Sequence, residues 1–300
     1  MSNQLSHAVR QAGTKASLVL EELAARRMRT LTVQTDKDWL SEITPHYPRL
    51  LSRMEDAKLL YRIQRGRYVV APRGTFSPAQ AASSELLAAR ILAPHGDYFI
   101  SHLTALIAHR LTDLHSSETY ATVRQSSNYR AAKVVLPLGT LRIVRIADSR
   151  WPIRHDGSRE IIEVRALPDT IEFFWRASPE RALVDALARP DLCAGFETVV
   201  GCWVNAKNAD TDWGGVCEIA RRQGPSMMRR VIFLLRLIGF DAVGQRAFPD
   251  LRGRGLSTLL DRSSSFQLPE RGRVRDRTTG IVVNVPPEYL LAWTGATSLM

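Results

Sequence analysis

Residues 47–70, with the sequence YPRLLSRMEDAKLLYRIQRGRYVV, decide the fold of the N-terminal part of the chain. Pro48 suits the first turn of a helix, where a proline loses no hydrogen bond. The apolar residues around it recur at helical spacing and are expected to face a core: Leu50, Leu51, Met54 and Ala57. Arg49 and Arg53 are four residues apart and therefore share the opposite edge of this helix.

A β-hairpin is predicted directly after this helix. Two segments rich in β-forming residues, 60–63 and 68–70, flank the sequence Gln64-Arg65-Gly66-Arg67. A glycine in a short turn between two such segments is typical of a hairpin. The arginines on and beside the turn would give this hairpin a basic surface.

Two further helices and a short strand are predicted upstream. Apolar residues at positions 16, 19, 20 and 23 predict an amphipathic helix, with Thr14 as its N-cap and the basic residues 26–29 at its end. Residues 31–33 are expected to be extended, and Thr35 to cap a second helix over 36–43. Helix, strand, helix, turn, helix and hairpin is the order of a winged helix-turn-helix, so this fold is predicted for residues 1–72.

The exposed edge of the third helix predicts contact with DNA. A helix is narrow enough to enter the major groove, where guanidinium groups can hydrogen-bond guanine edges or phosphates. The side chains expected in the groove are Tyr47, Arg49, Ser52 and Arg53. Those expected on phosphates, which position the protein without specifying sequence, are Lys58, Arg62, Arg65 and Arg67. A solvated helix face on a unit that contacts protein is the alternative, but cations on both helix and hairpin favour DNA.

The net charge of +11 is concentrated at the two ends of the chain. Residues 1–80 hold 13 Lys and Arg against 7 Asp and Glu, residues 81–220 hold 15 against 17, and residues 221–300 hold 13 against 6. Clustered basic charge indicates a polyanionic partner, although an arginine excess can also follow from a GC-rich genome.

Near the C-terminus the arginines alternate along the sequence: Arg271, Arg273, Arg275 and Arg277. They predict either a second surface that faces nucleic acid or a solvated strand edge, since alternating arginines also block edge-to-edge pairing.

The remainder of the chain is predicted to be a larger mixed domain. Residues 72–78 contain prolines and a glycine, so the linker is placed at 73–80 and the second domain at 81–300. Ser178 is expected to cap a helix that begins with Pro179. Other helices are expected at 81–92, 101–110, 196–206, 213–222 and 227–237, and strands at 119–124, 133–136, 141–146, 161–165, 170–175 and 280–285. The fold class is therefore α+β, with an N-terminal winged helix-turn-helix followed by a larger mixed α/β domain.

Membrane and secreted proteins are excluded by composition. No apolar run approaches the ~18 residues of a membrane span, and the N-terminus lacks the pattern of a signal peptide. Cys193, Cys202 and Cys217 are widely spaced and fit buried thiols in a reducing compartment better than disulfides. A cytoplasmic protein is therefore predicted.

No catalytic site, metal site or cofactor is predicted. His102 and His109 are seven residues apart, too far for a zinc pair on one helix, so they are expected to be packed or capping residues. Asp185 follows Ser178 by seven residues on one helix without a base, which does not support a hydrolase triad. A nuclease core would need a Pro-Asp followed by an acid-x-Lys, and Lys207 is preceded two positions earlier by Asn instead.

Four phrases of the sequence resemble the AbiEi antitoxins of type IV toxin–antitoxin and phage-defence loci. They are LYRIQRGRY at 60–68, SHLTAL at 101–106, HRLT at 109–112 and SPERALVD at 178–185, and their order and spacing are similar to the family's over nearly the whole chain. Arg110 replaces the glycine that the family has after the second histidine. The resemblance implies a repressor of its own operon that also neutralises a nucleotidyltransferase-like toxin encoded beside it, with the winged helix on operator repeats and the C-terminal part as the antitoxin.

Two other hypotheses remain open from the sequence. One is a one-component transcription factor whose C-terminal part binds a small ligand, and the other is a basic nuclease. A toxin gene beside this one would favour the antitoxin, and metal-dependent cleavage of DNA would favour the nuclease.

Overall fold

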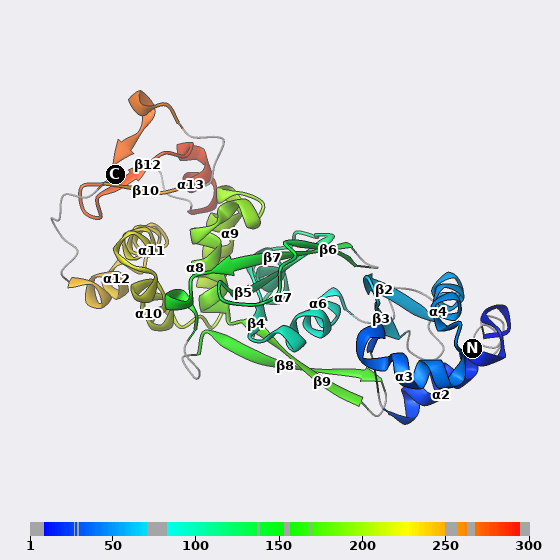
Figure 1. The fold of residues 1–300 in the computed structure, drawn as a ribbon. Helices are drawn as coiled ribbons and strands as arrows, with labels where there is room; N and C mark the ends of the chain where they lie inside the picture. The colour runs from blue at the N-terminus through cyan, green and yellow to red at the C-terminus, as the bar shows by residue number, and fades with distance from the viewer. Residues whose placement is uncertain are drawn as a thin grey trace.

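The computed structural model describes residues 9–26, 28, 30–70, 83–136, 139–152, 157–167, 170–249, 257–262 and 268–294. The fold is α+β: an N-terminal unit of helices and a small sheet lies at one end of an elongated molecule, and a larger mixed part forms the rest (Figure 1). The predicted linker at 73–80 lies outside the described residues. No helix among the described residues is long and apolar enough to cross a membrane.

The N-terminal unit has the predicted order of elements. They are α2 (Thr14–Ala25), β1 (Thr30–Thr32), α3 (Val33–Ile43), α4 (Tyr47–Asp56), β2 (Leu60–Gln64) and β3 (Arg67–Val70). The three strands form an antiparallel sheet in the order β1-β3-β2. Its core contains Val19 and Leu23 of α2, Leu40 of α3, and the predicted apolar stripe Leu50, Leu51 and Met54 of α4. Burying each of these larger side chains contributes about 1.5–3 kcal/mol, so this stripe fixes which edge of α4 remains exposed.

The starts of the first two helices differ from the prediction. Thr14 is the first residue of α2 rather than its N-cap, and Gly13 precedes the helix with a φ of +94°. Thr35 lies inside α3, which begins at Val33. The Asp36 carboxylate accepts a hydrogen bond from the backbone N–H of Thr32 at 2.7 Å. This bond joins the first turn of α3 to the N-cap residue Thr32, so the helix begins at Val33, before the position that a Thr35 cap predicts.

α4 ends in a Schellman motif centred on Lys58. The N–H of Lys58 donates to the carbonyl of Glu55, and that of Leu59 donates to the carbonyl of Met54, both at 2.8 Å. This turn requires a left-handed residue, and Lys58 has a φ of +56°. Arg110 occupies the same position after α7 (His102–Ala108), with a φ of +57° and a hydrogen bond from Leu111 N–H to the Leu106 carbonyl. A glycine suits that conformation best, so both Lys58 and Arg110 occupy backbone positions that a residue with a Cβ adopts at a cost.

The larger part is built around a six-stranded mixed sheet in the order β6-β7-β5-β4-β9-β8. Its strands are β4 (Tyr98–Ile100), β5 (Glu118–Arg124), β6 (Lys133–Leu136), β7 (Gly139–Ile146), β8 (Arg159–Leu167) and β9 (Thr170–Ala177). Tyr98 and Ile100 pack in one core with α6 (Ser84–Leu92), whereas Phe99 packs in another with α7 and α8 (Pro179–Ala188). Because neighbouring residues of a strand point to opposite faces, α6 covers one face of the sheet and α7 and α8 cover the other.

Helices and a second small sheet complete the molecule beyond α8 (Figure 1). The helices are α9 (Phe196–Lys207), α10 (Trp213–Gln223), α11 (Pro225–Leu237), α12 (Asp241–Ala247) and α13 (Pro287–Thr294). The strands β10 (Thr258–Leu259), β12 (Ile281–Val283) and β11 (Val274–Arg275) form the sheet in that order. The predicted helices and strands of the larger part are present within a few residues of their expected bounds, whereas β4, β10, β11, α12 and α13 were not predicted.

Candidate nucleic-acid interface

The exposed edge of α4 carries the side chains predicted to enter a DNA groove. Arg49, Ser52 and Arg53 are exposed, and Tyr47 is half-buried because its ring packs against the core of the N-terminal unit. Among the residues that the structure describes, neither guanidinium has a hydrogen-bond or ion-pair partner. Both are therefore available to an external acceptor.

The N-terminal end of α2 lies beside this edge. Nη1 of Arg53 is 3.9 Å from the point where a Cβ of Gly13 would stand. The backbone N–H groups at a helix N-terminus carry partial positive charge. Arg53 and the start of α2 therefore present positive charge to the same place.

The hairpin carries Arg62 and Arg65 on its exposed surface. Its turn contains Gly66, whose φ of +72° is in the left-handed region. The Gly66 carbonyl accepts a hydrogen bond from Val33 N–H at 2.7 Å, which ties the tip of the hairpin to the start of α3. Lys58 is exposed at the other end of the hairpin, directly after α4.

Arg67 does not lie with the other predicted phosphate contacts. It is half-buried, and its Nη1 lies 2.9 Å from Nε2 of His95 in the larger part of the chain. Burial, together with the charge of Arg67, lowers the pKa of His95, so its ring is neutral and can accept this hydrogen bond at neutral pH. Arg67 thus joins the hairpin to the larger part, which the sequence could not indicate because the two residues are 28 positions apart.

The C-terminal arginines do not share one strand, contrary to the alternating pattern. Arg271 lies in a 3-10 helix (Glu270–Gly272), Arg275 in β11 and Arg277 in the turn that follows. Arg273 is half-buried, and its Nε donates to the Leu268 carbonyl at 2.8 Å. A turn at 276–279 ends the strand. In this turn the Asp276 carboxylate accepts hydrogen bonds from the backbone N–H groups of Thr278 and Thr279. Three of the four arginines are exposed, but they do not form the regular row that the sequence predicted.

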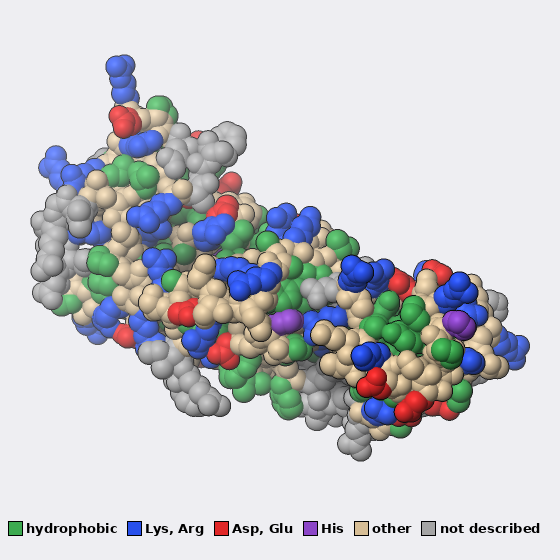
Figure 2. Space-filling view, viewed as in Figure 1, with side chains coloured by type: hydrophobic (Ala, Val, Ile, Leu, Met, Phe, Trp, Pro, Cys, Tyr) green, Lys and Arg blue, Asp and Glu red, His purple; other side chains and the backbone are tan. Residues whose placement is uncertain are grey.

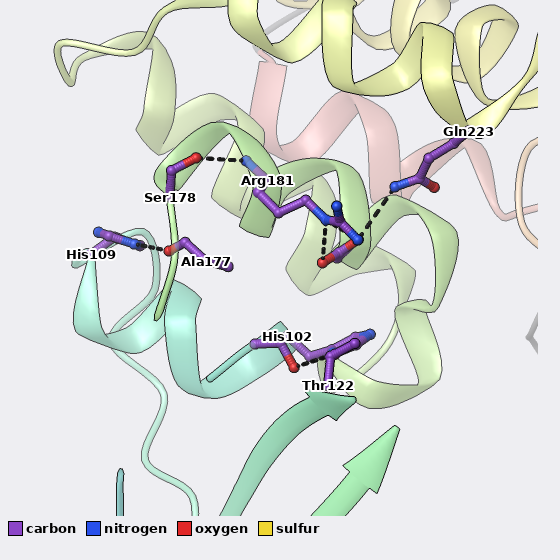
Figure 3. Close-up of polar contacts among 9 residues, drawn as sticks. His102, His109, Thr122, Ala177, Ser178, Arg181 and Gln223 are labelled. Atoms are coloured by element: carbon purple, nitrogen blue, oxygen red, sulfur yellow. Dashed lines mark hydrogen bonds and ion pairs between the residues drawn. The ribbon is translucent and has the colours of Figure 1, made fainter. Parts of the chain in front are cut away.

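The polar residues considered for catalysis hold α8 in place (Figure 3). Ser178 is the N-cap of α8, and its Oγ accepts a hydrogen bond from Arg181 N–H at 3.3 Å. Nε of Arg181 lies 2.8 Å from both carboxylate oxygens of Asp185, and Nε2 of Gln223 lies 3.3 Å from one of them. The side chains of the Arg181–Asp185 pair are only 4% and 8% exposed, so this is a buried ion pair rather than a nucleophile with a base.

The two histidines are packed, as predicted (Figure 3). His102 is buried, with its Nδ1 2.9 Å from the Ser101 hydroxyl, and burial lowers its pKa to about 4. His109 caps the end of α7, and its Nε2 lies 2.8 Å from the Ala177 carbonyl. Within the described ranges, no three His, Cys, Asp or Glu residues could hold a metal ion together.

The three cysteines are free thiols in the interior. Burial raises the pKa of Cys202 to about 12 and that of Cys217 to about 11, and it also raises the pKa of Cys193. Such thiols carry no thiolate at neutral pH, so they behave as small apolar side chains.

Comparison with known proteins identifies a similar architecture but no family. No family model matches the sequence, and no curated protein has a significantly similar sequence. The crystal structure of the RV2827C protein from Mycobacterium tuberculosis superposes on this chain with a TM-score of 0.66, covering 94% of this chain and 95% of that one, at 17% identity. The chain therefore shares its fold, across the N-terminal unit and the larger part together, with the RV2827C protein of M. tuberculosis.

Proposed function

We propose that this chain is a DNA-binding transcriptional regulator whose N-terminal unit is a winged helix-turn-helix. The observation that carries the proposal is α4, where a buried apolar stripe lies opposite an exposed edge of Arg49, Ser52 and Arg53. An α-helix with its side chains is about 10–12 Å across, and the major groove is about 12 Å wide, so α4 can lie in the groove with this edge against the bases.

Phosphate contacts would come from both sides of α4. Lys58, Arg62 and Arg65 are exposed after the helix, and the N-terminus of α2 lies beside Arg53. Each phosphate neutralised lowers the slope of log affinity against log salt by about 0.9. If the two arginines of α4 and these three cations all contact phosphate, a slope of roughly −4.5 is expected.

The test is binding of the full chain to the DNA upstream of its own gene, with a scrambled duplex as control, over a salt series. Tight and sequence-selective binding would support the proposal. Weak binding that is equal on both duplexes would refute it and assign the basic surface to another polyanion. Arg65→Ala should weaken both duplexes about equally, whereas the control Arg150→Ala, at an exposed position of a 3-10 helix in the larger part, should change neither.

The antitoxin role is a second, finer proposal. Two of the phrases that resemble the AbiEi family, at 101–106 and 178–185, lie together in the fold, because α7 packs on α8. If the resemblance holds, these two phrases form one packed unit of the larger part. The protein would then repress its own operon from the cytoplasm and neutralise a nucleotidyltransferase-like toxin.

Co-expression with a neighbouring toxin gene tests this role. Rescue of growth by the full chain, and also by the Arg49→Ala, Arg53→Ala double variant, would assign the antitoxin activity to the larger part. No rescue, with DNA binding intact, would favour a ligand-responsive regulator. Cleavage of the duplex that requires a divalent metal would favour the nuclease.

A further inference from the structure

The segment between β5 and β6 is held beside the hairpin of the N-terminal unit. His95, which contacts Arg67, also packs edge-on against Tyr129, with ring centroids 4.9 Å apart and an interplanar angle of 68°. Tyr129 is buried, and Val69 of β3 packs in the same core. The Tyr129 carbonyl accepts a hydrogen bond from the Arg145 guanidinium of β7. The residue that follows Tyr129 is therefore fixed close to the hairpin.

Two exposed cations lie on this segment and on the strand that it leads into. Arg130 follows Tyr129 directly, and Lys133 is the first residue of β6. β6 is an edge strand of the large sheet and contacts β2 of the hairpin. Figure 1 shows β6 beside β2, and Figure 2 shows Lys and Arg side chains along this side of the molecule, from α4 to β6 and β7.

Three acids of the large sheet and its loops already have partners. Glu118 forms an ion pair with Arg142, with 2.6 Å between Nη2 and Oε1, and Asp97 forms one with Arg124 at 3.1 Å. Asp148 accepts a hydrogen bond from Ser126 N–H at 3.3 Å. Arg130 and Lys133 have no hydrogen bond or ion pair with any residue that the structure describes, although Lys133 is close enough to the paired Glu118 to help lower the pKa of that carboxyl. β6 begins with Lys133 and contacts β2, the strand that carries Arg62, so this segment belongs to the side of the larger part that faces the hairpin.

We propose that Arg130 and Lys133 form a second phosphate-contacting surface, on which a DNA duplex bound by the N-terminal unit continues past the hairpin. This inference rests on the proposed function and assigns part of the DNA contact to the larger part of the chain. Arg130 and Lys133 are three residues apart, so their Cα atoms are at most about 11 Å apart, the length of about 3 base pairs of duplex. The bound DNA is thus longer on the hairpin side than a winged helix alone would need.

The test compares two operator duplexes with the full chain. The short duplex ends at the hairpin-side boundary of the sequence-specific site, and the long duplex continues for about 10 base pairs of arbitrary sequence. The wild-type protein should bind the long duplex about tenfold more tightly at 0.1 M salt, with a salt slope steeper by about 2, because two more phosphates are neutralised.

The Arg130→Ala, Lys133→Ala double variant should lose this difference and bind the short duplex as the wild type does. Arg130→Lys, which keeps the charge, should retain most of the gain, and Arg150→Ala should retain all of it. Equal affinity of the wild type for both duplexes, or an equal loss on both duplexes in the double variant, would overturn the inference while leaving the proposed function standing. Failure of the wild type to distinguish the operator from scrambled DNA would instead overturn the proposed function, and this inference with it.

Discussion

Replacing Lys58 by glycine separates the backbone conformation after α4 from the charge carried there. Lys58 has a φ of +56° at the C′ position of a Schellman motif. A left-handed conformation costs a residue with a Cβ about 1–2 kcal/mol, and the greater freedom of glycine in the unfolded chain costs about 0.5–1 kcal/mol. Lys58→Gly is therefore expected to raise the free energy of unfolding by about 0.5–1 kcal/mol while it removes a cation from the proposed DNA interface.

Lys58→Ala is the matched control, since it removes the same charge but keeps the strained backbone. Urea denaturation of the full chain should find the alanine variant close to wild type and the glycine variant more stable. Both variants should bind operator and scrambled DNA less tightly by the same factor, with a salt slope shallower by about 0.9. A glycine variant no more stable than the alanine variant would refute the argument from backbone strain. Unchanged DNA affinity in both variants would refute the assignment of Lys58 to phosphate.

Three further predictions concern other parts of the molecule. The Arg49→Ala, Arg53→Ala double variant should lose more affinity for the operator than for scrambled DNA, by about 1–3 kcal/mol for each guanine contact, whereas an equal loss in binding assays would leave these residues on phosphates only. Burial lowers the pKa of His102 to about 4, so between pH 6.5 and 4 the unfolded chain binds a proton that the folded chain does not. The free energy of unfolding therefore decreases as the pH is lowered from 6.5 to 4. Denaturation measured at each pH should show that His102→Asn removes about 3 kcal/mol of this decrease. Asp185→Ala should lower the free energy of unfolding by about 3–5 kcal/mol because it leaves Arg181 buried without its partner, and a replacement of both residues by apolar ones should cost less.

Most helices and strands could be predicted because their apolar periods are clear. The stripe of α4 and the capping serine of α8 are local signals, and both lead to the observed elements. β4 could not be predicted because it has only three residues and all of them are buried. It therefore shows no alternation of apolar and polar residues and is too short to be recognised as an apolar run. The start of α3 was misplaced because the side chain of Asp36 bonds back to Thr32, a competition that residue preferences at the N-cap do not describe.

The candidate interface could be predicted only in part. The exposed arginines of α4 follow from helical spacing, since the buried stripe determines where they lie. The contact between Arg67 and His95 depends on how the N-terminal unit packs on the larger part, and no local pattern encodes it. The same limit applies to Arg130 and Lys133, which become part of a basic surface only because the fold brings β6 to β2.

If the N-terminal unit binds DNA as proposed, the link between Arg67 and His95 would give the molecule a polarity on the duplex. With the larger part fixed to the hairpin, it extends along the duplex in one direction from each bound site. Two copies on inverted repeats would then have their larger parts either between the two sites or outside them, according to the orientation of the repeats. Direct repeats would place all copies head to tail. The arrangement of half-sites in an operator, and the spacing between them, would therefore decide whether neighbouring copies touch and bind cooperatively.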